Sequence, residues 1–214
     1  MSQQDNLDTQ MKWMIYGANG YTGELIARAA VSRGLKPVLA GRSRDKVQAL
    51  ARELGLEARV FSLEDEVRLL AQIKGHDLVL HCAGPFSATA APMMEACLRA
   101  NAHYLDITGE IAVFEHAQSL NDRARAAGVV ICPGVGFDVV PTDCVAAALK
   151  NAMPDATHLA LGFDSRSSFR PVLPRLRLRA WRRGAKFVVM AKSSQCRWPT
   201  GCVVLTSVPV RNSQ

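Results

Sequence analysis

The chain has 214 residues, of which 49% are hydrophobic and 21% charged, so it can bury the core of one domain or two. It contains no uncharged apolar run of about 18 residues and begins with polar residues, so we expect no transmembrane segment, no secretory signal peptide and a cytoplasmic protein. The net charge of +7 is unevenly distributed, since all 19 acidic residues precede Arg166, whereas 11 of the 26 Lys and Arg residues follow Ser165.

Apolar runs and helical patterns alternate along most of the chain, after a polar leader (residues 1–10) that we expect to be disordered. The apolar runs predict strands over residues 13–16, 37–40, 58–61, 78–82, 103–107 and 129–132. The segments between them predict helices over residues 25–31, 44–54, 63–73, 88–100 and 113–127. Because strands and helices alternate, we predict an α/β fold with a doubly wound parallel sheet of the Rossmann type and the strand order 3-2-1-4-5-6. A helix over residues 144–152 and a strand over residues 158–163 are predicted to follow.

Several apolar side chains are predicted to fill the core. Val67, Leu70 and Ile73 share one face of the helix predicted over residues 63–73. Met93 and Met94 are interpreted in the same way, as core residues and not as part of a cofactor site.

The cysteines give no indication of a metal site. They lie at positions 82, 97, 132, 144, 196 and 202, without a Cys-x-x-Cys pair and without a His at a spacing typical of zinc. We therefore expect reduced thiols and no metal. Cys82 and Cys132 each end an apolar run, so both are predicted to be small buried residues of strands.

Three glycines spaced three apart lie between the first predicted strand and the first predicted helix. Glycine can adopt a positive φ in a tight turn and lets a phosphate approach the main chain, where the first N–H groups of the helix can bind it. Within a βαβ unit, this spacing predicts a dinucleotide site whose pyrophosphate contacts Gly17, Ala18, Asn19, Gly20, Tyr21, Thr22 and Gly23. The alternative is that the glycines serve only the close packing of the strand and the helix.

The second predicted strand leads into Arg42 and Ser43, where a dinucleotide fingerprint contacts the ribose of the adenosine. An acidic residue at this position would accept hydrogen bonds from a 2′-hydroxyl, but the chain has Arg42, with Arg44 and Lys46 close behind. Because a guanidinium can pair with a phosphate through two hydrogen bonds, Arg42 and Ser43 predict the 2′-phosphate of NADP. The alternative is that Ser43 caps the following helix while the cations face solvent.

The turns after the later strands complete the predicted site, because ligands of an open α/β sheet lie beyond the carboxyl ends of its strands. The nicotinamide end of the cofactor is predicted to lie beside Ala83, Gly84, Pro85 and Phe86. The substrate is predicted to meet the cofactor at Gly109, Glu110, Gly136, Phe137 and Asp138. No spacing in the sequence identifies a catalytic proton donor.

Three titratable residues near these turns have two interpretations each. His81 stands in an apolar strand, so we interpret it as a hydrogen-bonded core residue, with a catalytic role as the alternative. Asp138 and Asp143 could act as general acids or bases. Asp143, however, falls in the first turn of a predicted helix, where the helix dipole favours a carboxylate.

Five motifs in order carry a family resemblance: residues 17–23, 40–43, 82–86, 104–110 and 136–143. Over about residues 12–165 the chain resembles the saccharopine dehydrogenase-like oxidoreductases, and among them the trans-acting enoyl reductases. The resemblance implies an NADP-binding Rossmann domain, here residues 11–153, and the start of an α+β substrate and dimerisation domain at residues 154–165. It also implies hydride transfer to a small-molecule substrate, and homodimers of the intact proteins.

The resemblance ends after Ser165. Residues 166–214 are rich in arginine and proline and contain no acidic residue, and back-translation in another frame gives a sequence similar to the family's continuation. We therefore expect a frameshift near residues 166–169 and a truncated chain with a non-native, poorly ordered basic tail. The alternative is that the cations of the tail, with Trp181, Phe187 and Trp198, bind nucleic acid.

The motifs together predict an NADP-dependent oxidoreductase of the saccharopine dehydrogenase-like or enoyl reductase type. Loss of the C-terminal domain is expected to impair turnover and leave NADP binding, because substrate contacts that position the reactants would be missing. The alternative is a non-catalytic nucleotide-binding or redox-sensing module.

Overall fold

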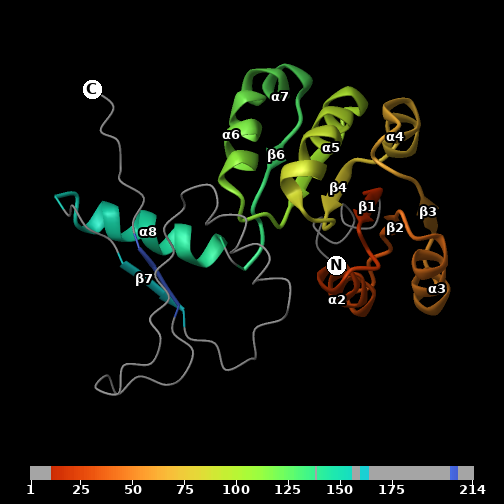
Figure 1. The fold of residues 1–214 in the computed structure, drawn as a ribbon, viewed down its shortest axis with the longest axis horizontal. Helices are drawn as coiled ribbons and strands as arrows, with labels where there is room; N and C mark the ends of the chain where they lie inside the picture. Colours follow the sequence, from red (N-terminus) through yellow and green to blue (C-terminus); the bar gives the residue numbers. More distant parts are fainter. Residues whose placement is uncertain (1–10, 138, 156–159, 164–202, 207–214) are drawn as a thin grey trace, which may run out of the picture. The chain divides into compact units, whose positions relative to one another are not determined.

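The computed structural model describes residues 11–137, 139–155, 160–163 and 203–206 of the protein (Figure 1). The contacts within the chain define two compact units, Met1–Val140 and Pro141–Gln214. In the described part of the chain, no helix combines the length and the apolar composition needed to cross a membrane.

The first unit is built on a six-stranded sheet in which every pair of neighbours is parallel. Its strands are β1 (Trp13–Tyr16), β2 (Val38–Gly41), β3 (Ala58–Val60), β4 (Leu78–His81), β5 (His103–Asp106) and β6 (Ile131–Cys132). The spatial order is β3-β2-β1-β4-β5-β6, which confirms the predicted Rossmann-type order. The central strand β1 is paired on both sides, so that Ile15 lies opposite Leu39 of β2 and Leu80 of β4.

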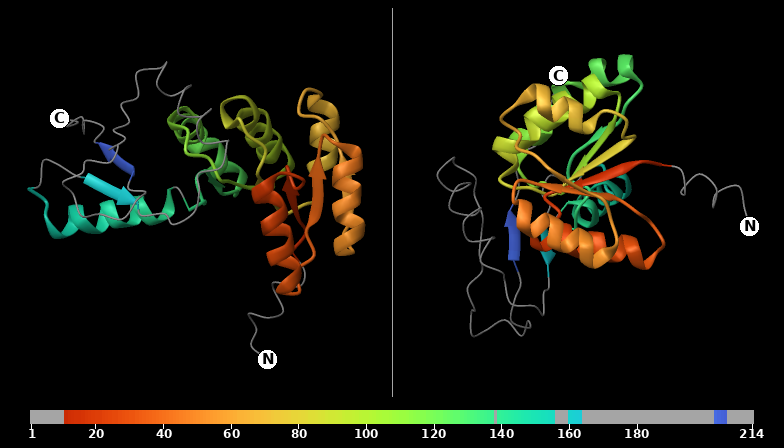
Figure 2. Two further views of the ribbon diagram at one scale, coloured as in Figure 1. Left: turned by 60° about the horizontal axis from the view of Figure 1, so that its bottom comes forward. Right: turned by 90° about the vertical axis from the view of Figure 1, so that its right-hand side faces the viewer.

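Helices cover both faces of this sheet, as the right-hand view of Figure 2 shows. One face carries α2 (Tyr21–Ser32) and α3 (Arg44–Leu54), and the other carries α4 (Glu66–Ile73), α5 (Phe86–Ala100), α6 (Ile111–Ser119) and α7 (Asn121–Ala127). Alternate residues of β1 therefore enter different cores: Ile15 packs with the α2 and α3 residues, whereas Met14 and Tyr16 pack with those of α4 to α7. Met93 and Met94 are fully buried in the second core, as predicted. Burial on both faces explains why the central strands β1, β2 and β4 are mainly apolar, without polar alternation.

The helix predicted over residues 63–73 is shorter than expected. It begins at Glu66 because Asp65 caps it, accepting a hydrogen bond of 3.0 Å from the N–H of Arg68. The buried residues of this helix are Leu69 and Ile73, which are one turn apart, and Leu70 is half-buried. The prediction that Val67 is buried is therefore wrong, since this residue is 80% exposed.

Two further expectations on this face of the sheet are corrected. The helix predicted over residues 113–127 is divided at Leu120, whose N–H donates to the carbonyl of Ala117 and whose side chain is buried. Cys132 is exposed, not buried, because it ends the two-residue strand β6, which pairs only with β5 at the edge of the sheet. Cys82 is partly buried and lies just after the end of β4, and desolvation raises the pKa of its thiol to about 12.

The second unit has α8 (Val140–Ala152) and an antiparallel pair formed by β7 (Ala160–Phe163) and β8 (Val203–Thr206). Asp143 falls in the first turn of α8, as the dipole argument expects. The strand β8 belongs to the basic tail, in which residues 166–202 and 207–214 lie outside the described residues. The boundaries at residues 153 and 165, and the proposed origin of the tail, remain predictions.

Candidate cofactor site

Five turns follow the carboxyl ends of β1, β2, β4, β5 and β6. Because the strands are parallel, these turns gather along one edge of the sheet, where an open α/β sheet binds its ligands. They comprise residues 17–20, 42–43, 82–85, 107–110 and 133–137. The predicted site residues that the structure describes all lie in these turns or in the first turn of the helix that follows.

The turn after β1 is held against both neighbouring strands. The N–H of Gly17 donates to the carbonyl of Ala40 on β2 over 2.8 Å. Gly17 has a φ of +83°, and a Cβ placed on it would lie 2.8 Å from the nitrogen of Ala83 and 2.9 Å from its Cβ, just after β4. Only glycine combines a favourable positive φ with the absence of a Cβ that would collide with Ala83. The first glycine of the motif therefore brings the turns after β1 and β4 into contact.

The second and third glycines lead the chain into α2. The N–H of Gly20 donates to the carbonyl of Gly17 over 2.9 Å, and α2 begins at Tyr21. A Cβ on Gly23 would collide with the carbonyl oxygen of Gly17 and lie 2.9 Å from the Cα of Ala18. The glycines thus satisfy the close packing of strand and helix, and the same geometry presents the first N–H groups of α2 at the sheet edge, where anions bind.

The cation after β2 is available for a ligand. Arg42 is exposed and takes part in none of the ion pairs found among the described residues. Ser43 stands at the N-cap position of α3, but its side chain makes no capping hydrogen bond. The adjacent Gly41 lies beneath Asn19, whose side-chain oxygen would be 2.8 Å from a Cβ on that glycine. The turns after β1 and β2 therefore adjoin, with Arg42 at their edge.

The turn after β4 is bonded to the turn after β5. It contains Ala83, Gly84 and Pro85, with a cis Gly84–Pro85 peptide bond, and α5 begins at Phe86. The carboxylate of Glu110 accepts a hydrogen bond of 2.9 Å from the N–H of Phe86 and one of 3.0 Å from the N–H of Ser87. A carboxylate is favoured at the N-terminus of a helix, so this contact stabilises both turns.

His81 lies beneath the turn after β4 and has no exposed surface. Its Nε2 is 2.9 Å from the hydroxyl of Thr89, and that hydroxyl donates to the carbonyl of Ala83 over 2.7 Å. Since the hydroxyl has one proton, His81 donates to Thr89 through Nε2, and its buried Nδ1 has no hydrogen-bond partner. Burial lowers the pKa of His81 to about 3. The burial of His81 and its contact with Thr89 confirm the interpretation of His81 as a hydrogen-bonded core residue.

The burial of His81 predicts a pH-dependent stability. In the unfolded chain His81 binds a proton near pH 6.5, whereas in the folded chain it does so only near pH 3. The unfolded state therefore binds more protons between these values, and stability falls as the pH is lowered through 6.5. We expect His81 to contribute a loss of about 2 kcal/mol in the free energy of unfolding between pH 7 and pH 5.

Urea unfolding of the wild type and of His81→Gln at both pH values tests this expectation. The amide nitrogen of Gln can take the place of Nε2 opposite Thr89, and the variant lacks the titrating ring. His76, whose pKa is also lowered by burial, is present in both proteins, so its contribution cancels in the comparison. The same loss of stability in both proteins would show that His81 is not its source.

Asp106, the last residue of β5, has no exposed surface and is not among the predicted site residues. Its Oδ2 accepts the hydroxyl of Tyr104 at 2.7 Å. Its Oδ1 accepts the N–H of Thr108 at 2.9 Å and that of Gly134 at 2.8 Å. Asp106 therefore joins the turns after β5 and β6. An acidic residue at the end of an apolar strand was the available signal.

The turn after β6 lies next to the turn after β5. A Cβ on Gly136 would be 3.2 Å from the Cβ of Ile107, so this predicted substrate residue has little space on that side. Phe137 is 76% exposed. Asp138 lies outside the described residues. Gly109 is exposed and has open space around it.

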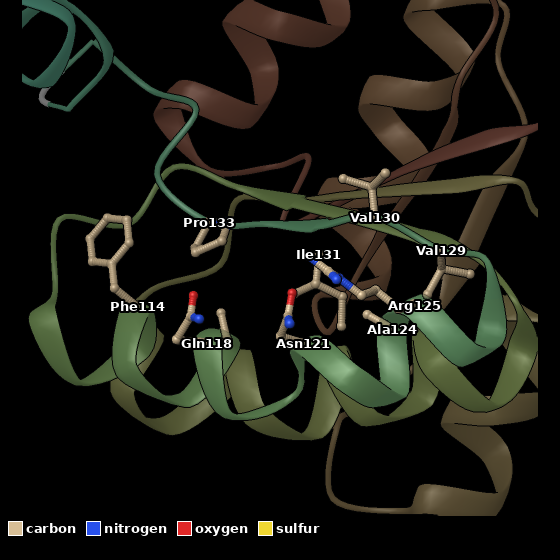
Figure 3. Close-up of a pocket in the computed structure, with 10 residues that line it drawn as sticks. Phe114, Gln118, Asn121, Ala124, Arg125, Val129, Val130, Ile131 and Pro133 are labelled. Atoms are coloured by element: carbon tan, nitrogen blue, oxygen red, sulfur yellow. The ribbon is translucent and has the colours of Figure 1, made fainter. Parts of the chain in front are cut away.

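A separate hollow of about 410 Å³ lies between α6, α7 and the strand β6 (Figure 3). Apolar side chains of Phe114, Val129 and Ile131 line it together with the polar ends of Gln118 and Asn121. It contains none of the predicted cofactor-binding residues. Among the described residues, no group of three or more His, Cys, Asp or Glu side chains could hold a metal ion.

A parallel sheet in this order, with a glycine turn after β1 and a free arginine after β2, defines a Rossmann-type nucleotide-binding domain. The family model of the saccharopine dehydrogenase NADP-binding domain matches residues 13–132, and the chain belongs to this family. The family confirms both the resemblance and the prediction of NADP as the cofactor.

Known relatives agree with this assignment. The chain is 28% identical over 160 residues to the saccharopine dehydrogenase-like oxidoreductase of Homo sapiens, covering 65% of this chain and 37% of the relative. It is 30% identical over 138 residues to the trans-acting enoyl reductase of Mycobacterium tuberculosis, covering 61% and 33%. The solved structure of saccharopine dehydrogenase (L-Glu forming) from Saccharomyces cerevisiae matches with a TM-score of 0.60 at 15% identity, covering 71% and 34%, and shows the shared fold. The chain thus spans about a third of the length of each of these relatives.

Proposed function

We propose that this chain binds NADP(H) along the turns after β1, β2 and β4, and that it is the cofactor domain of an NADP-dependent oxidoreductase. The observation that carries the proposal is the free Arg42 beside the glycine turn. In this proposal the pyrophosphate lies on the main chain of residues 17–23 and the 2′-phosphate on Arg42 and Ser43. The nicotinamide end lies by residues 83–86.

The residues present fit this cofactor. Gly17 and Gly23 leave no room for a Cβ, and this close packing holds the turn after β1 so that α2 begins at the sheet edge, where its first N–H groups can bind a phosphate. Arg42 supplies a cation that no described carboxylate neutralises. Bound NADPH supplies a hydride, and the chain's own contribution is to bind and orient the cofactor and to exclude water.

The Arg42→Ala variant tests the cofactor preference. We expect it to weaken NADPH binding about tenfold or more, because a charge-assisted pairing with the 2′-phosphate is lost. NADH lacks that phosphate, so its affinity is expected to remain unchanged. Fluorescence titration of the purified full chain with each dinucleotide measures both affinities.

The matched control is Arg52→Ala, which removes an exposed cation from the last turn of α3, the helix that follows Arg42. This variant is expected to bind NADPH as the wild type does. If the wild type binds neither dinucleotide, the proposed function is wrong. If it binds NADH more tightly than NADPH, the role proposed for Arg42 is wrong.

We further propose that the activity is hydride transfer between NADP(H) and a small molecule that contains an enoyl or imine group. The mycobacterial relative is named an enoyl reductase and the human relative an oxidoreductase, which supports hydride transfer and the enoyl class; the imine class follows from the resemblance to saccharopine dehydrogenases. The substrate is proposed to approach the turns that contain Gly109, Gly136 and Phe137. Oxidation of NADPH by the full chain with such substrates tests the proposal. Binding without turnover of either class would favour the alternative, a nucleotide-binding or redox-sensing module.

We also propose a cytoplasmic location for the protein. Its described cysteines, Cys82, Cys97, Cys132 and Cys144, are free thiols, and free thiols are typical of the reducing cytoplasm. A homodimer is proposed from the family resemblance, and size-exclusion chromatography with light scattering would test it.

A further inference from the structure

The contact between Glu110 and the start of α5 joins distant parts of the chain. Both oxygens of the carboxylate accept main-chain N–H groups, from Phe86 at 2.9 Å and from Ser87 at 3.0 Å, across 24 and 23 residues of sequence. Glu110 is the residue that the sequence analysis assigns to the substrate, but its carboxylate is bonded to the protein itself. Its orientation is therefore set before any ligand binds.

Glu110 is in turn held by the end of β5. The hydroxyl of Thr108 accepts the N–H of Glu110 over 3.0 Å, and the N–H of Thr108 donates to the buried carboxylate of Asp106. Thr108 and Asp106 have no exposed surface. A continuous series of hydrogen bonds thus runs from the core of the sheet, through Glu110, to the first turn of α5.

The series of hydrogen bonds from Asp106 through Glu110 ends at the turn between β4 and α5, which faces the glycine motif. Ala83, in the turn before α5, lies against Gly17, and its carbonyl accepts the hydroxyl of Thr89 from inside α5. Thr89 holds the turn from the core side and Glu110 holds it from the side of β5. Arg42, by contrast, follows β2 on the other side of β1. A dinucleotide laid across β1 would therefore have one end beside Arg42 and the other end beside the turn that Thr89 and Glu110 hold.

We propose that Glu110 is a positioning residue, which fixes the turn between β4 and α5 in the form that the nicotinamide half of NADP(H) requires. This inference rests on the proposed function. Glu110 acts through the main chain of Phe86 and Ser87, and not by touching the reacting atoms. The adenosine half, bound beside Arg42 and the glycine turn, does not depend on it.

The test compares two ligands of the full-length chain, NADPH and adenosine 2′,5′-bisphosphate, which has the 2′-phosphate but no nicotinamide. We expect Glu110→Ala to weaken NADPH binding about five- to tenfold and to leave the affinity for adenosine 2′,5′-bisphosphate within about twofold of the wild type. Glu110→Gln, which keeps one acceptor oxygen, is expected to give an intermediate loss. Isothermal titration calorimetry measures all of these affinities.

The control is Glu115→Ala, which removes an exposed carboxylate from α6 and is expected to change neither affinity. Equal losses for both ligands in Glu110→Ala would mean that the carboxylate serves only general stability and would overturn the proposal. Unchanged NADPH affinity would overturn it too. If the wild type binds neither ligand, the proposed function itself fails, and that outcome is distinct from the other two.

Discussion

Replacing Gly17 with alanine is expected to lower the free energy of unfolding by about 3 kcal/mol or more and to abolish measurable NADPH binding. Two costs combine at this position. The φ of +83° is unfavourable for any residue with a Cβ, and that Cβ would lie 2.8 Å and 2.9 Å from atoms of Ala83. The 2.8 Å contact is with the main-chain nitrogen of Ala83, after β4, so relief requires the turns after β1 and β4 to separate.

Gly34→Ala is the matched control for this variant. Gly34 has nearly the same φ, +78°, but no atom lies within 4 Å of the position where its Cβ would stand. It follows the end of α2, away from the sheet edge that carries the site. We expect a loss of about 1 kcal/mol from backbone strain alone, with NADPH affinity unchanged.

Urea unfolding and NADPH fluorescence titration of the two variants separate the cost of the positive φ from the cost of the contact between the new Cβ and Ala83. A Gly17→Ala protein as stable as Gly34→Ala would show that the contact with Ala83 relaxes at no cost. A Gly17→Ala protein that binds NADPH like the wild type would show that the turn after β1 is not the phosphate site.

The order of the sheet could be predicted because its signals are local. Each strand from β1 to β6 is an apolar run ended by a turn, and each connection is long enough for a helix, which leaves few topologies for a parallel sheet. The helix boundaries of α3 were also predictable, since Ser43 precedes it and Gly55 ends it with a φ of +67°.

The errors have both local and tertiary causes. The late start of α4 has a local cause, since Asp65 caps the helix by accepting the N–H of Arg68. The break at Leu120 buries that side chain against the core shared by α5 and α6. No local sequence pattern predicts this break. Cys132 is exposed because its strand lies at the edge, and edge position follows from topology.

In the candidate site, too, features set by local sequence could be predicted, and features set by tertiary contacts could not. The residues that follow strands, such as Gly17 and Arg42, could be predicted from their position in the alternation of strands and helices. The partners of Asp106 and Glu110 could not, because those hydrogen bonds span 28 and 24 residues and depend on how neighbouring turns meet. The sequence therefore predicted which turns form the candidate site, and the structure was needed to show what holds these turns together.

Removing the buried carboxylate in Asp106→Ala is expected to lower the free energy of unfolding by about 3–5 kcal/mol. The hydroxyl of Tyr104 and the N–H groups of Thr108 and Gly134 would lose their acceptor inside the protein. Asp77→Ala is the control, because Asp77 also accepts a main-chain N–H, from Lys12 at 2.8 Å, but is exposed, so that water can replace it. We expect a loss of about 1 kcal/mol or less in that variant.

Asp106→Asn distinguishes lost hydrogen bonds from lost charge. The amide oxygen can still accept the N–H groups of Thr108 and Gly134, and the amide nitrogen can donate to the hydroxyl oxygen of Tyr104, so the loss is expected to be about 1 kcal/mol. Urea unfolding of the three variants measures this ranking. If Asp106→Asn is as unstable as Asp106→Ala, the negative charge is what the site needs. If Asp106→Ala is as stable as Asp77→Ala, the turns after β5 and β6 do not depend on this carboxylate. The series from Asp106 to Glu110 would then lack the rigid start that its positioning role requires.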